Sequence, residues 1–180
     1  MNKVFFNFII LLLITGCSSV NNLEAVKNDI FDGSYDNLIF SKESFSSLDF
    51  KFSKEYDVSG LPNALEAHYG FFKRREFEIR FYPSNELAVS SGVFFADEVT
   101  GDDAIIKKSD ASWKEGIKDR MTSGAFGNKK NTPKYMDYVV LGNMIVLCPI
   151  EISSSELGAT EPMENCRMLL SELPEIKKLD

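Results

Sequence analysis

Two uninterrupted apolar runs, separated only by a glycine and an asparagine, constrain the fold of this 180-residue chain more than any other feature. The runs are residues 138–141 and 144–147, with Gly142-Asn143 between them. Glycine at the first central position of a two-residue loop is typical of a type II′ hairpin, so we predict two antiparallel strands here. Because neither run alternates apolar with polar residues, both faces of each strand should be covered. The hairpin should therefore lie at the centre of a layered domain.

Alternation predicts two further strands. Residues 48–52 and 77–81 alternate apolar side chains with polar or charged ones, which is the period of a half-buried strand. In the second strand the apolar residues should face the core. Its charged neighbours, Glu76, Glu78 and Arg80, should then face water.

Helical spacing of apolar residues predicts helices over residues 62–72, 84–99 and 161–173, with a shorter one after Asp110. The order of elements is then strand, helix, strand, helix, hairpin, helix. This order favours an α+β structure, with an antiparallel or mixed sheet of about four strands covered by helices. A ferredoxin-like arrangement is one candidate. The length suits a single domain, which we expect over residues 47–180.

The N-terminus has the layout of an export signal. Lys3 precedes an apolar run over residues 4–14, and small residues come just before Cys17. The run is too short to span a bilayer, which takes about 20 apolar residues. Residues 14–17, Ile-Thr-Gly-Cys, resemble the lipobox of bacterial lipoproteins, where the chain is cleaved before the cysteine and the cysteine is acylated. An uncleaved membrane anchor is the alternative.

The resemblance implies that residues 1–16 are a lipoprotein signal peptide and that acyl chains such as palmitate on Cys17 hold the mature chain in a membrane. Ser18 stands where an aspartate retains many such lipoproteins in the inner membrane. The implied location is the periplasmic face of an outer membrane. Residues 17–46 are rich in polar residues and predict a lipid-anchored tether, but three phenylalanines among them indicate that part of it packs on the domain.

Acylation of Cys17 leaves an even pair of cysteines in an exported chain, where disulfides persist. Cys148 follows the second hairpin strand, and Cys166 lies on the apolar stripe of the last predicted helix. We predict a disulfide between them, which contributes about 3 kcal/mol in the chain-entropy model. Two buried free thiols are the alternative. A zinc site is disfavoured because the spacing matches no common zinc module.

The net charge of −7 argues against a nucleic-acid partner, because phosphates repel an acidic chain. The basic clusters at residues 73–75 and 129–130 are short and typical of solvated faces. The carboxylates of residues 97–103 fit a solvated helix end as well as a calcium site. His68 is the single histidine and has no partner at a spacing that suggests catalysis or metal binding. We therefore assign no catalytic residue, no metal and no cofactor.

Residues 121–134 contain no predicted element, which is uncommon inside a compact domain unless the stretch is functional or disordered. Phe126 is the apolar anchor of this stretch, and Lys129, Lys130 and Lys134 lie close to it. These four residues form a candidate binding loop for an acidic or phosphate-bearing partner, including a lipid headgroup. A solvated loop without function is the alternative.

Together these features favour a membrane-anchored, non-enzymatic envelope module that binds or assembles a protein, lipid or small ligand. The alternative is a periplasmic, carboxylate-dependent hydrolase acting on envelope material, with Glu76 or Glu78 as the acid. A deep cleft containing a carboxylate of shifted pKa would favour the enzyme, and a shallow aromatic patch would favour the binding module.

Overall fold

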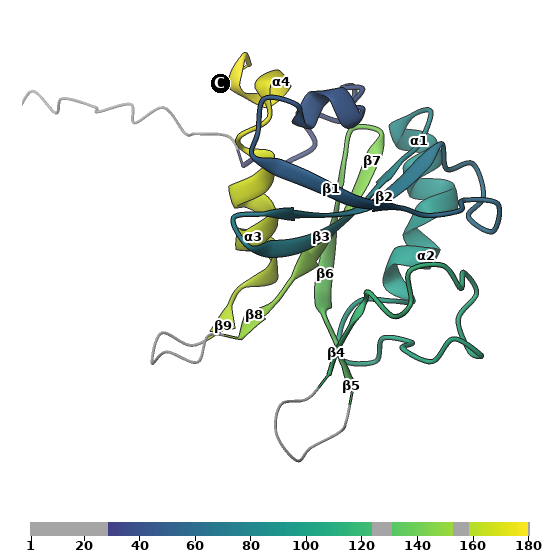
Figure 1. Ribbon diagram of the computed structural model, residues 1–180. Coiled ribbons are helices and arrows are strands. Elements are labelled where there is room, and N and C mark those ends of the chain that lie inside the picture. The colour runs from purple at the N-terminus through teal and green to yellow at the C-terminus, as the bar shows by residue number, and fades with distance from the viewer. Residues whose placement is uncertain (1–28, 124–130, 153–158, 180) are drawn as a thin grey trace, which may run out of the picture.

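A five-stranded antiparallel sheet is the frame of the computed structural model, which describes residues 29–123, 131–152 and 159–179 (Figure 1). The strand order is β1-β2-β3-β7-β6. These strands are β1 Phe50–Glu55, β2 Glu66–Phe72, β3 Arg75–Phe81, β6 Tyr135–Leu141 and β7 Met144–Pro149. Two short ladders pair β4 Met121–Ser123 with β5 Asn131–Pro133 and β8 Glu151–Ile152 with β9 Ala159–Thr160. The predicted α+β class with an antiparallel sheet is confirmed, but the main sheet has five strands rather than four.

The helices are few and short. A 3-10 turn covers Lys42–Phe45, and one helical segment joins α1 Asn85–Leu87, a π-helical turn Ala88–Gly92 and α2 Val93–Asp97. The chain closes with α3 Pro162–Leu170 and α4 Pro174–Lys177. The first three strands of the sheet follow one another without a helix between them, unlike the β-α-β-β-α-β order of a ferredoxin-like domain. The ferredoxin-like arrangement is therefore not confirmed.

The central hairpin is confirmed. Gly142 has φ of 53°, and Asn143 has no positive φ, as a type II′ turn requires. A side chain at Gly142 would meet the Leu38 carbonyl oxygen at 2.3 Å, so packing also demands glycine here. The Asn143 side chain accepts a hydrogen bond from Phe40 N and donates to Tyr82 O, at 2.6 and 2.7 Å. The turn thus ties the N-terminal segment to the sheet.

Both faces of β7 are buried, as its continuous apolar run predicts. Val146 and Cys148 join the main core with α3, whereas Ile145 and Leu147 pack with the segment that contains α2. In Figure 1, α3 and α2 accordingly lie on opposite sides of the β6–β7 hairpin.

The helix predicted over residues 62–72 is wrong, because residues 66–72 form β2. Their apolar side chains have a helical spacing, but the segment pairs with β1 and β3 along its two edges, and side chains on both of its faces are buried. The Phe50 ring packs directly on Gly70 of β2. A Cβ atom at residue 70 would lie 2.5 Å from that ring. The helix predicted after Asp110 is also wrong, because residues 98–120 form only turns, bends and irregular backbone.

The predicted outward orientation of Glu78 and Arg80 is wrong as well. Both side chains are fully buried, although the apolar residues of β3 do face the main core. The reason is that residues 98–120 cover the second face of β3. The Trp113 indole N–H holds this cover in place by donating to the Asp57 carbonyl at 3.1 Å. Lys54 of β1 binds Asp119 at 2.8 Å.

The C-terminal helix also differs from the prediction, because it breaks after Leu170 and a second short helix starts at Pro174. At the other end, the sequence predicts that part of residues 17–46 packs on the domain. Four residues of this range do lie in the main core, each below 5% exposed, and these are Ile30, Tyr35, Phe40 and Phe45. The core therefore includes residues as far back as Ile30. Among the described residues, no helix has the length and apolar character needed to cross a bilayer.

Candidate functional site

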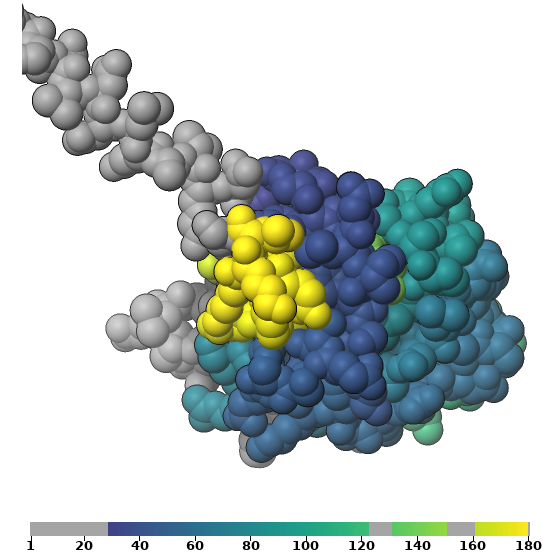
Figure 2. Space-filling view, turned by 90° about the horizontal axis from the view of Figure 1, so that it is seen from above, coloured from purple at the N-terminus to yellow at the C-terminus, as the bar shows by residue number. Residues whose placement is uncertain are grey.

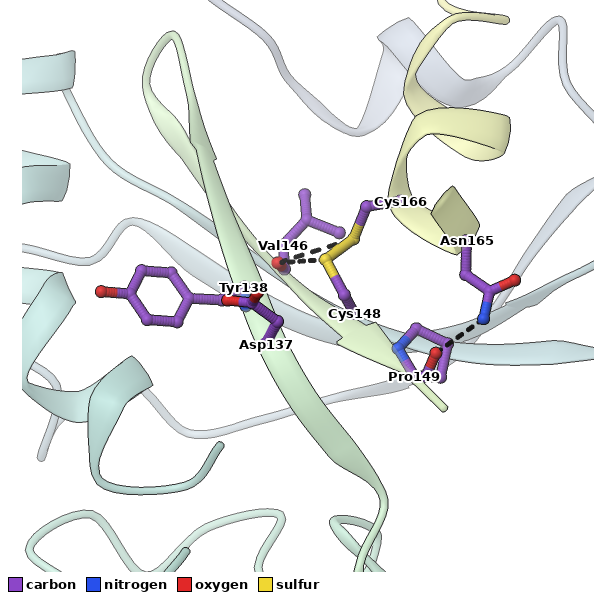
Figure 3. The surroundings of a disulfide bond; sticks show 7 residues. All are labelled: Asp137, Tyr138, Val146, Cys148, Pro149, Asn165 and Cys166. Atoms are coloured by element: carbon purple, nitrogen blue, oxygen red, sulfur yellow. Dashed lines mark hydrogen bonds between the residues drawn. A yellow bond between two sulfur atoms is a disulfide. The ribbon is translucent and has the colours of Figure 1, made fainter. Parts of the chain in front are cut away.

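The Cys148–Cys166 disulfide fixes the end of β7 to α3 (Figure 3). The two Cα atoms are 5.4 Å apart, and both side chains are fully buried. Directly beside the disulfide, the Asn165 side-chain amide donates a hydrogen bond of 2.8 Å to the Pro149 carbonyl. The backbone at the end of β7 is therefore held from two neighbouring positions of α3.

Of the predicted binding residues, only Lys134 lies within the described part of the chain. Phe126, Lys129 and Lys130 fall outside it, as does the acylation site Cys17. Lys134 immediately precedes β6, and its side chain is 15% exposed. Its ammonium group forms an ion pair with Glu76 and lies 5.3 Å from the centre of the Tyr69 ring. The structure thus joins two residues that the sequence assigned to different functions, the binding-loop lysine and one candidate acid.

The β2–β3 turn next to this ion pair has an unusual backbone. Lys73 and Arg74 are its two central residues, and their φ angles are 46° and 65°. Two positive φ angles define a type I′ turn, for which Asn-Gly is the preferred sequence. Long side chains in the left-handed region cost roughly 1–2 kcal/mol each. Both side chains are exposed, so they do not gain this energy back by burial in the core.

A cavity of about 220 Å³ lies beside this turn and brings these groups together. It is lined by Arg74, Arg75, Glu76, Thr122, Lys134, Pro149 and Ile150. Three cations and one carboxylate therefore surround a small space on a chain whose net charge is −7. A local positive potential of this kind attracts anionic groups. We call this cavity the cationic pocket.

Hydrogen bonds hold several residues that line the cationic pocket. Pro149 is held by Asn165, and the Ile150 N–H donates to the Lys134 carbonyl at 3.1 Å. Burial raises the pKa of Tyr69, as does its hydrogen bond to Glu76, so the hydroxyl stays protonated and donates to the carboxylate. Tyr69, which does not line the cavity, thereby helps to position Glu76.

A second cluster of charged residues lies inside the molecule rather than at its surface. Glu78 Oε1 accepts from Arg80 Nε at 2.8 Å, and Glu78 Oε2 accepts from Arg120 Nε at 2.7 Å. A third bond of 3.0 Å runs from Arg120 to Oε1. Both guanidinium groups pack on Trp113, with their central carbons 5.0 and 4.5 Å from the ring centre. We call Glu78, Arg80 and Arg120 the buried ion cluster.

The chemistry of the buried ion cluster differs from that of a catalytic acid. Burial alone would raise the pKa of Glu78, but the charges of Arg120 and Arg80 outweigh it and lower that pKa. The carboxylate therefore stays ionised, and both of its oxygens accept hydrogen bonds. A general acid needs a raised pKa and contact with a substrate. Glu78 instead has a lowered pKa, and its side chain is fully buried against the two arginines.

His68 is on β2, is 1% exposed and lies 2.7 Å from a Glu66 oxygen. Its ring packs against Phe52, with the ring centres 5.1 Å apart. Within residues 29–123, 131–152 and 159–179, no group of three or more histidine, cysteine, aspartate or glutamate residues is placed to hold a metal ion.

Residues 73–75 were interpreted as a solvated basic cluster and Arg80 as a residue that faces water, and Arg120 was not singled out from the sequence. The local signal for the turn is weak, because the basic residues directly follow Phe71 and Phe72 but include neither asparagine nor glycine. No local signal marks Arg120, since its partner Glu78 is 42 residues away.

The cationic pocket and the buried ion cluster both lie within residues 41–175, which match a family model described as a family of unknown function, DUF6810. No curated protein and no solved structure matches the chain. Because the match covers most of the sequence, this chain belongs to the DUF6810 family.

Proposed function

We propose that this protein is an envelope lipoprotein that acts as a non-enzymatic binding module and recognises an acidic group of its ligand in the cationic pocket. Acyl chains on Cys17 anchor it at the periplasmic face of the outer membrane. The lipobox-like residues 14–17 support the anchor, and the Cys148–Cys166 disulfide is consistent with an oxidising compartment.

The observation that carries the proposal is the left-handed backbone of Lys73 and Arg74. A turn selected for stability alone would have asparagine and glycine here. Retaining two cationic side chains instead costs roughly 1–2 kcal/mol per residue. Strained backbone that persists in a fold is concentrated at functional sites. Arg74 lines the cationic pocket, which gives this strain a use.

The hydrolase alternative requires a free carboxyl group with a raised pKa. Glu78 is ionised and saturated by two arginines, and Glu76 is paired with Lys134. The geometry of both glutamates therefore supports the binding module over the carboxylate-dependent hydrolase.

The binding proposal is tested with a chain that starts at residue 18. This chain keeps all the buried apolar side chains that the structure describes, which lie between Ile30 and Ile176. Its affinity for a peptide of six glutamates is measured by titration calorimetry, with and without Arg74→Gly. We expect Arg74→Gly to weaken binding by about tenfold, because one close charge contact is lost. Its free energy of unfolding should stay the same or rise by up to about 1 kcal/mol, because glycine relieves the positive φ.

The matched control is Lys114→Gly, which removes one positive charge as Arg74→Gly does. Lys114 is exposed, and it lines another cavity rather than the cationic pocket. The control should bind the peptide as the parent chain does. Unchanged binding by Arg74→Gly would refute the proposed site. Equal weakening by both variants would show that only the total charge matters.

The anchor is tested separately, by growing cells that express the full chain with labelled palmitate. The full chain should carry the label and sediment with membranes, and Cys17→Ser should lose the label. Labelling of the Cys17→Ser variant, or no labelling of either chain, would refute the anchor.

A further inference from the structure

Successive residues of the β2–β3 turn line two different cavities. Arg74 lines the cationic pocket, and Lys73 lines a larger cavity of about 610 Å³. The second cavity is formed by Ser47, Leu48, Asp49, Phe72, Lys73, Glu172, Pro174, Lys177 and Lys178. We call it the helix-end cavity, because four of these residues follow α3. It combines three apolar side chains with three lysines, and such a lining suits an amphiphile with a negative headgroup.

The lysines that line the helix-end cavity outnumber its acidic residues. Lys177 lies 2.5 Å from Glu172, and this hydrogen bond lowers the pKa of Glu172 and keeps the pair ionised. Lys73 lies above the Phe72 ring, 4.9 Å from its centre. Lys178 is exposed. With Asp49 and Glu172 counted, the lining keeps a net positive charge on a chain whose total is −7.

The cavity lies where residues 47–49 meet residues 172–178, and the first described residue, Asp29, is fixed to α3 of the same C-terminal segment. The Asp29 carboxylate binds Arg167 of α3 through hydrogen bonds of 2.6 and 3.1 Å. Figure 2 shows the C-terminal segment, in yellow, lying directly against the N-terminal part of the domain, in dark blue. Next to Lys178, Leu179 is 63% exposed. Leu179 therefore adds an apolar side chain to the exposed surface beside Lys178.

We propose that the helix-end cavity docks the domain on an anionic bilayer, with lipid phosphates at Lys73, Lys177 and Lys178 and with Leu179 in the interface. This inference rests on the proposed lipid anchor. Twelve peptide units join Cys17 to Asp29, and at about 3.3–3.6 Å each they reach at most about 43 Å. The anchored domain therefore stays within reach of the membrane surface, and docking sets its orientation there.

The test measures binding of the chain that starts at residue 18 to vesicles of phosphatidylglycerol and phosphatidylcholine, by co-sedimentation. Each lysine near an anionic surface changes binding by about fivefold, so the charge reversals Lys73→Glu, Lys177→Glu and Lys178→Glu together should weaken it by at least about 100-fold. Lys108→Glu, Lys114→Glu and Lys118→Glu form the matched control, since they make the same charge change at exposed lysines that line another cavity. The control triple should lose much less binding.

Two further variants separate this inference from the proposed function. Arg74→Gly should weaken binding of the glutamate peptide but leave vesicle binding within twofold. Leu179→Ser keeps the charge and should still weaken vesicle binding several-fold. Thermal unfolding followed by Trp113 fluorescence checks that each variant is folded, and triple Lys→Gln substitution at the same sites replaces the reversals if they prevent folding.

Equal losses in the two lysine triples would overturn the inference, and so would binding to pure phosphatidylcholine vesicles that matches binding to the anionic ones. Complete inhibition by dissolved glycerol phosphate would also overturn it, because the site would then take free phosphate rather than a membrane. A chain that docks on vesicles but takes no palmitate would refute the anchor and leave the docking surface in place.

Discussion

Substitution of Glu78 by glutamine should remove much of the stability of this protein, although it changes only one atom. Glu78 is fully buried and accepts three hydrogen bonds, of 2.7, 2.8 and 3.0 Å, from Arg80 and Arg120. Glutamine keeps one acceptor oxygen and places an amide group against the guanidinium groups. Both arginines then remain buried without a counter-charge.

The size of the loss follows from these contacts. A hydrogen bond to a charged group contributes about 1.5–3 kcal/mol, and at least one of the three is lost. Removing one partner from a buried ion pair costs about 3–5 kcal/mol in total, because the remaining charge is uncompensated. We expect Glu78→Gln to cost about 4 kcal/mol. Domains are stable by about 5–15 kcal/mol, so a loss of about 4 kcal/mol removes roughly a quarter to four-fifths of the total.

The assay is urea unfolding followed by the fluorescence of Trp113, the only tryptophan. It contacts both guanidinium groups and therefore reports on this region directly. Glu76→Gln on the same strand is the control. Its side chain is 34% exposed, so this change should cost about 1 kcal/mol or less. Replacing Glu78, Arg80 and Arg120 together by methionine should cost little or even stabilise, because no buried charge remains.

A loss below about 1 kcal/mol for Glu78→Gln would refute the reasoning, because it would mean that water or another anion compensates the two arginines. A triple methionine variant that is less stable than the single variant would also refute it. In that case the cluster would contribute through its specific geometry rather than through charge balance.

Three further results should follow. Because the pKa of Glu78 is lowered in the folded chain, ionised Glu78 stabilises the fold above its unfolded pKa of about 4.3, and this stabilisation is lost as the pH falls further. In urea titrations at decreasing pH, the difference in free energy of unfolding between the parent chain and Glu78→Gln should therefore narrow. Replacing Cys148 and Cys166 by serine should lower the free energy of unfolding by about 3 kcal/mol, and a reductant in the parent sample should reproduce that loss in calorimetry. Gly142→Ala should cost about 2 kcal/mol or more, because φ is positive and the new methyl group meets the Leu38 carbonyl; an unchanged melting temperature would contradict the hairpin geometry.

The cationic pocket was only partly predictable. Lys134 was singled out, but it was expected to act with the lysines of its own loop, and its partners within the described residues are Glu76 and Tyr69 of neighbouring strands. The turn at Lys73 and Arg74 lacks the glycine and asparagine that normally indicate a type I′ hairpin. The helical interpretation of residues 62–72 then concealed that these residues connect two strands.

The sequence by itself determined the elements whose signals are local. The Gly142-Asn143 hairpin, the α+β class and the Cys148–Cys166 pairing all follow from residues whose conformation or chemistry depends on near neighbours and on the period of burial. Only the tertiary structure decided that Glu78 and Arg80 are buried. Alternation along a strand gives the two faces but not what covers them. Residues 98–120, an irregular segment without a periodic signal, bring Arg120 and Trp113 over that face from 42 and 35 positions away, and contacts at such separations depend on the folded chain as a whole.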